Sequence, residues 1–290
     1  MRPPRTTSRR ARPLPEPDDR ERLASLLRGA RLALLTGAGI STESGIPDYR
    51  GPETQRRARN PIRFADYMRD DHLRARYWAR SMLGWARFSA ARPNAGHRAV
   101  AELEARGLAS GPITQNVDRL HHAAGSRDVI ELHGALAEVR CLDCDLREAR
   151  DRVQVRLEAD NATLLAHAPE LAPDGDAELD ATRALLEGFV VPRCLACGGT
   201  LKPDVVFFGE NVRRELVDTA YARVAAADAL LVIGSSLAVF SGHRFVRRAH
   251  ELGKPVAIVS LGPTRGDELA SVRVEARAGE LLPWLVTALG

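Results

Sequence analysis

The sequence lacks long apolar runs, contains few cysteines and has almost no lysine. None of its apolar runs comes near the roughly eighteen residues that a transmembrane helix needs, so we expect no membrane-spanning segment and no membrane partner. Lysine occurs at Lys202 and Lys254 alone, so the positive side of the formal net charge of +4 is carried almost entirely by arginine. A charge this small permits acidic partners without requiring them, and we do not expect nucleic acid to be one.

The bulk composition is that of a globular protein with one large domain and a smaller module. Its 290 residues are 44% hydrophobic and 28% charged, which is enough to bury a sizeable core. Residues 1–20 are rich in proline and arginine and lack apolar periodicity, which predicts a disordered tail. This start could also be read as an organelle-targeting peptide, but it has no apolar segment of the kind that directs secretion.

The four cysteines form two Cys-x-x-Cys pairs, Cys141 with Cys144 and Cys194 with Cys197. In a chain without an export signal, such pairs indicate metal binding rather than disulfides. Four thiolates supply a closed tetrahedral site, which predicts one structural Zn²⁺ ion with no part in catalysis. The loop between the pairs is longer than usual, and a redox dithiol is the alternative.

The stretch from Thr36 to Gly51, TGAGISTESGIPDYRG, follows the apolar run from Arg31 to Leu35. A buried strand that ends in Gly-x-Gly is typical of a dinucleotide site, because Gly37 and Gly39 allow a tight turn and a close approach to a pyrophosphate at a helix N-terminus. The fingerprint is incomplete, since Thr42 stands where its third glycine would fall. From these residues alone, a plain tight turn is the alternative.

Three later segments also place polar side chains at the ends of short apolar strands. Gln115, Asn116 and Asp118 follow PIT, His133 follows DVIEL, and the Gly/Ser turn 234–236 follows ADALLVI. Open α/β sheets bind ligands at the carboxyl ends of their strands, although an ordinary Asn/Asp turn would also explain the first segment. His133 is the candidate general base, because imidazole titrates near neutrality.

Together these motifs resemble those of the sirtuins, the NAD-dependent protein deacylases, and in particular their class II, which includes a mitochondrial member. The resemblance rests on GAGISTESGIPDYR, TQNVD, ELHG, LKPDVVFFGE, the two cysteine pairs and the insert LAPDGDAELD between those pairs. It extends from about Leu23 to Leu289. It implies an α/β fold in which a Rossmann-like, doubly wound parallel sheet carries a smaller zinc-binding and helical lobe.

The same resemblance divides the chain into the tail, residues 1–20, and a catalytic domain, residues 21–290. The large NAD-binding lobe would comprise residues 21–53, 93–138 and 201–290. The small lobe would comprise a helical insertion, residues 54–92, and a zinc module, residues 139–200. NAD would bind in the crevice between the two lobes.

The resemblance also implies site residues. His133 would be the catalytic base, Asn116 would order the ribose and a water, and Asp118 would bind the nicotinamide carboxamide. Val206, Phe207, Phe208 and Gly209 would line the acyl-lysine channel, and Ser260 replaces an asparagine that many sirtuins use to grip the adenosine ribose. The NAD site would comprise Gly37, Ala38, Gly39, Thr42, Glu43, Pro47, Asp48, Tyr49, Arg50, Gln115, Asn116, Val117, Asp118, His133, Gly234, Ser235, Ser236, Ser260, Leu261, Gly262 and Ala278.

Some conspicuous residues are interpreted as structural. His121 and His122 are expected on a helix behind the ligand loop. Tyr77 and Arg80 lie three residues apart, a pair that sirtuins with a preference for acidic acyl groups carry. Because arginines surround this pair, we interpret it as a packed tyrosine beside a solvated arginine, with no catalytic role.

The activity implied by the resemblance is deacylation of acyl-lysine proteins or peptides. The enzyme would cleave the nicotinamide–ribose bond of NAD and transfer the acyl group to ADP-ribose. Mono-ADP-ribosyl transfer to protein is the nearest alternative; an NAD-dependent dehydrogenase and a nucleic-acid-binding zinc ribbon are more distant ones. We expect a monomer, cytoplasmic in a bacterium or mitochondrial in a eukaryote.

Overall fold

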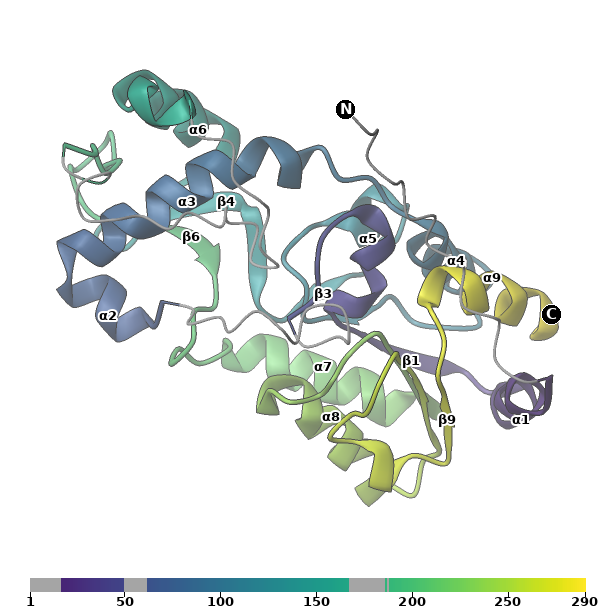
Figure 1. The fold of residues 1–290 in the computed structure, drawn as a ribbon. Helices are drawn as coiled ribbons and strands as arrows, with labels where there is room; N and C mark the ends of the chain where they lie inside the picture. Colours follow the sequence, from purple (N-terminus) through teal and green to yellow (C-terminus); the bar gives the residue numbers. More distant parts are fainter. Residues whose placement is uncertain (1–16, 50–61, 167–185, 187) are drawn as a thin grey trace, which may run out of the picture.

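The computed structural model describes residues 17–49, 62–166, 186 and 188–290 (Figure 1). Residues 1–16 of the predicted tail, Arg50 and the insert LAPDGDAELD lie outside the described residues. For residues 17–20 the prediction of a disordered tail is wrong, because they begin the first helix. The described part contains a parallel sheet of six strands and a separate antiparallel sheet of three strands. The predicted α/β fold with a smaller lobe is confirmed.

The large sheet has the strand order β3-β2-β1-β7-β8-β9, and every pair of neighbours is parallel. Its strands are β1 (Leu32–Thr36), β2 (Ile113–Thr114), β3 (Ile130–Glu131), β7 (Ala229–Ile233), β8 (Val256–Val259) and β9 (Val272–Val274). The apolar runs LALLT and ALLVI form β1 and β7 and are buried along their whole length. Continuous burial is expected for central parallel strands, because helices cover both faces.

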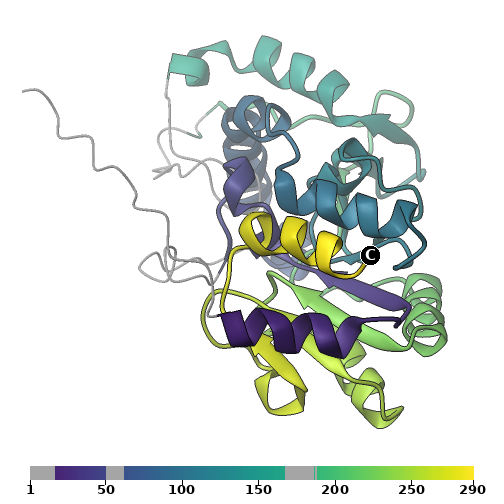
Figure 2. The ribbon, with the colours of Figure 1, turned by 90° about the vertical axis from the view of Figure 1, so that its right-hand side faces the viewer.

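Alternate residues of β1 and β7 point into two cores, one on each face of the sheet. Leu34 and Leu231 pack against α1 (Pro17–Leu27), α4 (Ala95–Ala105) and α9 (Ala278–Ala288). Leu35 and Val232 pack against α7 (Arg214–Ala226) and α8 (Phe240–Glu251) on the other face. Figure 2 shows α1 and α9 lying over the same side of the sheet. The predicted doubly wound arrangement is therefore confirmed.

The small sheet has the order β5-β4-β6 and is antiparallel. Its strands are β4 (Gly134–Cys141), β5 (Arg147–Ala149) and β6 (Leu201–Val205), and α2 (Phe64–Arg69), α3 (Asp71–Ser89) and α6 (Arg150–Asp160) lie around it. One core that includes Trp78 of α3, Val139 of β4 and Leu157 of α6 joins them. By its pairing, β6 belongs to this sheet, although its residues fall in the segment 201–290 that the sequence assigned to the large lobe.

The structure gives detail to two segments that the sequence outlined only coarsely. The helical stretch expected over 54–92 is, within the described residues, two helices, because the Asp70 carboxylate accepts the N–H groups of His72 and Leu73 and starts α3. The Gly-rich loop continues as two short 3₁₀ turns, Ala38–Ile40 and Thr42–Ser44, and not as the long helix of a complete dinucleotide fingerprint. Among the described helices, none is both long and apolar enough to cross a membrane.

The loops that follow β1 and β7 meet at the point where the strand order reverses. Gly39 donates its N–H to the Gly234 carbonyl at 2.8 Å. Gly234 has a φ of 61°, and a Cβ added there would lie 2.4 Å from the Ile40 nitrogen. The crevice at this switch point is where open α/β sheets place their ligands.

Replacing Gly234 by alanine should destabilise the fold by about 2–5 kcal/mol, because the left-handed backbone and the clash with Ile40 both oppose a Cβ. Gly253→Ala is the matched control, since its φ is 68° but nothing lies within 4 Å of the added Cβ. Gly253→Ala should lower the free energy of unfolding by only about 1–2 kcal/mol. Urea unfolding measures both values, and equal losses would contradict the role given to the loop contact.

Candidate functional site

A cavity of about 500 Å³ lies at the carboxyl ends of the large sheet and reaches the end of the small one. All the residues predicted to bind NAD or substrate line it, apart from Glu43, Pro47 and Arg50. Arg50 lies outside the described residues. The Glu43 carboxylate instead accepts the N–H of Gly279 at 2.8 Å and ties the loop to α9.

The glycines of the first loop are required by contact with the β7 loop. A Cβ on Gly37 would lie 2.8 Å from the Ser235 Cβ, and one on Gly39 would lie 2.8 Å from the Gly234 carbonyl oxygen. The N–H groups of Gly37 and Gly39 donate to Ile233 and Gly234. The sequence analysis explained these glycines by the close approach of a ligand. The structure shows that close packing against the β7 loop also requires them.

A polar cluster stands at the floor of the cavity. The Ser41 hydroxyl donates to Asp118 Oδ2 at 2.6 Å, and the Asn116 side-chain amide donates to the same hydroxyl at 3.1 Å. Asp118 also accepts the N–H of Leu120 at 2.9 Å. Burial raises the pKa of Asp118 in spite of these hydrogen bonds. Sequence reasoning missed Ser41, although it lies inside the Gly-rich motif.

Two buried histidines lie beneath this cluster. His97 Nε2 is 3.4 Å from the Ser41 hydroxyl, and His121 Nε2 is 2.9 Å from the Thr36 hydroxyl. Their ring centroids are 5.1 Å apart. Burial lowers the pKa of His97 to about 4 and that of His121 to about 3. Both rings are therefore neutral at pH 7, in agreement with the structural role expected for His121.

His133 joins the two sheets, because it lies between the end of β3 and the start of β4. Its Nδ1 is 2.8 Å from the Gln115 carbonyl oxygen, which can only accept a hydrogen bond. Nδ1 must therefore carry the proton, which leaves Nε2 with the lone pair of a base. Burial lowers the pKa of His133, and the charge of Arg244 lowers it further. The position that follows His133 must be a glycine, since a Cβ on Gly134 would lie 2.0 Å from the Asp204 carbonyl oxygen.

The segment after β6 forms the other wall of the cavity. The Val206 N–H donates to the His133 carbonyl at 2.9 Å, and the Phe207 N–H donates to Glu210 Oε2 at 2.6 Å. The same Glu210 oxygen pairs at 3.0 Å with Lys202, which is 6% exposed. Burial lowers the pKa of Lys202, whose ammonium also lies 4.6 Å from the Phe207 ring centroid. This ion pair, in which the lysine is buried and the glutamate partly exposed, fixes the turn of the expected substrate wall.

Tyr77 and Arg80 both line the cavity, so the helix face that they share is turned toward it. Tyr77 is buried, and its ring centroid lies 5.2 Å from that of Phe207. Both residues belong to α3, which lies beside the small sheet. The three-residue spacing predicted that they share a helix face. Which surface that face covers depends on the packing of α3, which the sequence does not reveal.

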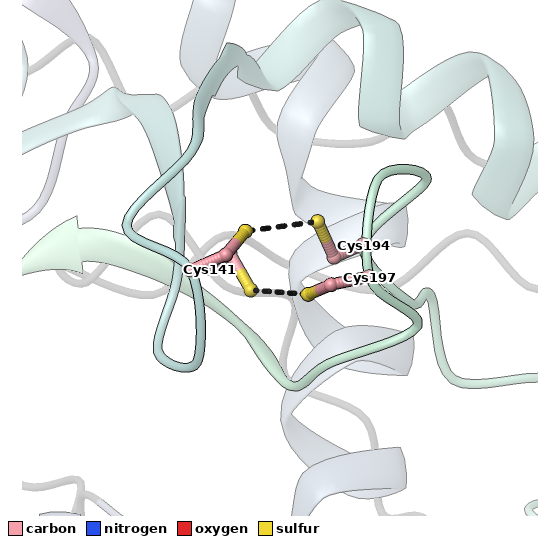
Figure 3. A group of neighbouring side chains, drawn as sticks. Cys141, Cys194 and Cys197 are labelled. Carbon is pink, nitrogen blue, oxygen red and sulfur yellow. Dashed lines mark hydrogen bonds between the residues drawn. The ribbon is translucent and has the colours of Figure 1, made fainter.

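The four cysteines converge at the far end of the small sheet. Figure 3 shows Cys194 and Cys197 facing the turn that carries Cys141. The sulfurs of Cys141 and Cys197 are 3.5 Å apart and those of Cys144 and Cys194 are 3.7 Å apart, with all four within 4.8 Å of one another. A tetrahedral Zn²⁺ with Zn–S bonds of about 2.3 Å needs sulfurs roughly 3.8 Å apart, so the donor set fits a structural zinc ion.

The protein should bind one zinc ion per chain, and Cys194→Ser should lose it and destabilise the zinc module. Elemental analysis of the purified protein and hydrogen exchange in β4, β6 and α6 measure the two effects. Thr200→Ser is the matched control, because it changes a neighbouring residue that has no thiol. Full zinc content in Cys194→Ser would contradict the assignment.

Acid should destabilise the fold through His97 and His121. Their folded pKa values lie below the ordinary value near 6.5, so the unfolded chain takes up protons first as the pH falls. Each histidine should lower the free energy of unfolding by about 1.4 kcal/mol per pH unit from pH 6.5 down to its folded pKa. Urea unfolding at several pH values measures the slope, which His121→Gln should reduce by about half. An unchanged slope in that variant would contradict this account.

Comparisons with known proteins identify the family. The Sir2 family matches residues 37–241. A Xanthomonas campestris protein named NAD-dependent protein deacetylase is 53% identical over 258 residues, which cover 89% of this chain and 87% of the relative. The Bos taurus protein named NAD-dependent protein lipoamidase sirtuin-4, mitochondrial, is 48% identical over 274 residues, 92% of this chain and 86% of the relative.

Solved structures give the same result. A Sir2 enzyme with a deacetylated peptide and 3′-O-acetyl ADP-ribose matches with a TM-score of 0.74 and 30% identity, over 92% of this chain and 97% of that one. Fold, cysteine cluster and sequence identity thus agree with the resemblance inferred from the motifs. This chain belongs to the Sir2 family, the sirtuins.

Proposed function

We propose that this chain is an NAD-dependent protein lysine deacylase that transfers the acyl group to ADP-ribose and releases nicotinamide. The observation that carries the proposal is the position of His133. Its neutral imidazole lines one cavity together with the Asn116–Asp118 cluster and the Val206–Gly209 wall. The name of the Xanthomonas relative and the peptide complex of the Sir2 enzyme support the same activity.

Each group of residues that lines the cavity would have its own role in the reaction. NAD supplies a ribose carbon whose bond to nicotinamide can break. Asp118 and Asn116 would hold the nicotinamide end at the cavity floor, where Ser41 fixes both side chains. His133 Nε2 would remove a proton from a ribose hydroxyl, because Nδ1 is occupied by the Gln115 carbonyl. The loops after β1, β7 and β8 would hold the rest of the dinucleotide at the switch point.

The acyl-lysine peptide would lie against the Val206–Gly209 wall as an added strand. Phe207 and Leu136 line the cavity and are buried, and such apolar surroundings favour the reaction by excluding water. We propose a monomer that needs no nucleic acid. For a bacterial chain we propose a cytoplasmic location.

The acyl group that the enzyme prefers would be set by the cavity beyond the lysine channel. Tyr77 and Arg80 both line that cavity. The two relatives carry different activity names, deacetylase and lipoamidase. A peptide panel with acetyl, lipoyl, succinyl and branched acyl-lysines, followed by mass, separates these possibilities. ADP-ribose attached to protein would indicate the transferase alternative instead.

His133→Ala should reduce nicotinamide release from NAD and acyl-lysine peptide by at least about a hundredfold, because it removes the general base. Zinc content and the unfolding midpoint should stay close to those of the wild type. His250→Ala is the matched control, since His250 is exposed on α8. Turnover retained by His133→Ala would refute the proposed role.

A further inference from the structure

The base nitrogen of His133 already has a partner within the protein. Ser241, in the first turn of α8, places its hydroxyl oxygen 2.8 Å from His133 Nε2. Because the Gln115 carbonyl fixes the proton on Nδ1, Nε2 can only accept. The Ser241 hydroxyl therefore donates its proton to the lone pair that a base would use.

This contact is held from both sides by Gln115. The main-chain carbonyl of Gln115 orients His133, and its side chain packs under the first turn of α8, where a Cβ on Gly242 would lie 2.6 Å from it. The Gln115 side chain is fixed in turn, since its Oε1 accepts the hydroxyl of Ser235 at 2.7 Å. Ser241 is 8% exposed and lines the cavity. The backbone positions of Ser241 and His133 relative to each other are thus set by the fold, and only the serine hydroxyl is free to turn.

We propose that Ser241 is a positioning residue for His133. Its hydroxyl keeps the imidazole neutral and its lone pair aimed into the cavity until a substrate hydroxyl takes its place. The place of this step in a reaction rests on the proposed function, whereas the Ser241–His133 contact stands on the geometry alone. Nothing in the sequence motifs that identify the site points to Ser241.

The exchange needs little rearrangement. A serine side chain turns about a single bond between staggered positions, so its hydroxyl can leave Nε2 while α8 stays in place. A substrate hydroxyl would then replace the serine hydroxyl with a hydrogen bond of similar strength. The proton that the substrate gives up moves to Nε2, and the imidazole becomes the imidazolium. Ser241 keeps its own proton throughout.

Charged groups around the cavity bear on this contact. Within the described residues, those that line it are Asp48, Arg80, Asp118, Glu210, Arg244 and Arg277. Arg244 lies one turn after Ser241 on α8, and its charge acts on the pKa of His133 in the same direction as a donated hydrogen bond. Arg244 and Ser241 therefore both favour the neutral imidazole.

Nuclear magnetic resonance titration of the His133 ring in the NAD-free protein tests the contact without using activity. In Ser241→Ala, the ratio of neutral to protonated His133 at a given acidic pH should fall about two- to tenfold, since the neutral form loses a donor. Ser241→Thr keeps the hydroxyl and should restore the wild-type curve. Ser25→Ala, the same change at an exposed site on α1, should not move it. Identical curves for wild type and Ser241→Ala would overturn the proposal.

Steady-state kinetics test what the Ser241–His133 contact does for turnover. In Ser241→Ala, kcat/KM for NAD should fall more at pH 6 than at pH 8, and Ser241→Thr should reverse the difference. Equal losses at both pH values would overturn the role in positioning the base. If the wild type released no nicotinamide at all, the proposed function would fail, while the titration of His133 would still decide whether Ser241 holds the ring.

Discussion

The hydrogen bond from His133 Nδ1 to the Gln115 carbonyl is the contact on which the site depends. Gln115 stands at the end of β2, where its N–H donates to the Thr36 carbonyl at the end of β1. The bond therefore fixes the position of the imidazole relative to β1 and β2, at the centre of the parallel sheet. It also selects the tautomer, and it does so through a backbone atom that a side-chain substitution leaves in place.

The two sheets contribute different parts of the site. The large sheet supplies the loops at its switch point, the Asn116–Asp118 cluster and the buried histidines behind it. The small sheet supplies the Val206–Gly209 wall, which the Lys202–Glu210 pair holds in shape. The cysteine cluster lies at the other end of that sheet, where a closed four-thiolate site stabilises the lobe and leaves the chemistry to the cavity.

Much of this arrangement could be predicted from the sequence, because its motifs encode local physical requirements. Glycines before and after tight turns, polar residues at strand ends and paired cysteines each follow from backbone or ligand chemistry. Ser41, Ser241 and Arg80 could not be placed in the same way. The roles of Ser241 and Arg80 come from the packing of α8 and α3 against the cavity, and helical spacing gives a face without saying what that face covers. The role of Ser41 comes from the turns after β1, which bring its hydroxyl to Asp118. The short 3₁₀ turns after Gly37 were also missed, since they depend on contact with Gly234.

The central claim is that the neutral imidazole of His133 faces the ribose that carries nicotinamide. A crystal structure of the protein with NAD and an acyl-lysine peptide tests it most directly. The account predicts a ribose hydroxyl within hydrogen-bonding distance of Nε2, about 2.6–3.2 Å, with Ser241 turned away. A nicotinamide ribose placed away from His133, with the Ser241 contact intact, would contradict it.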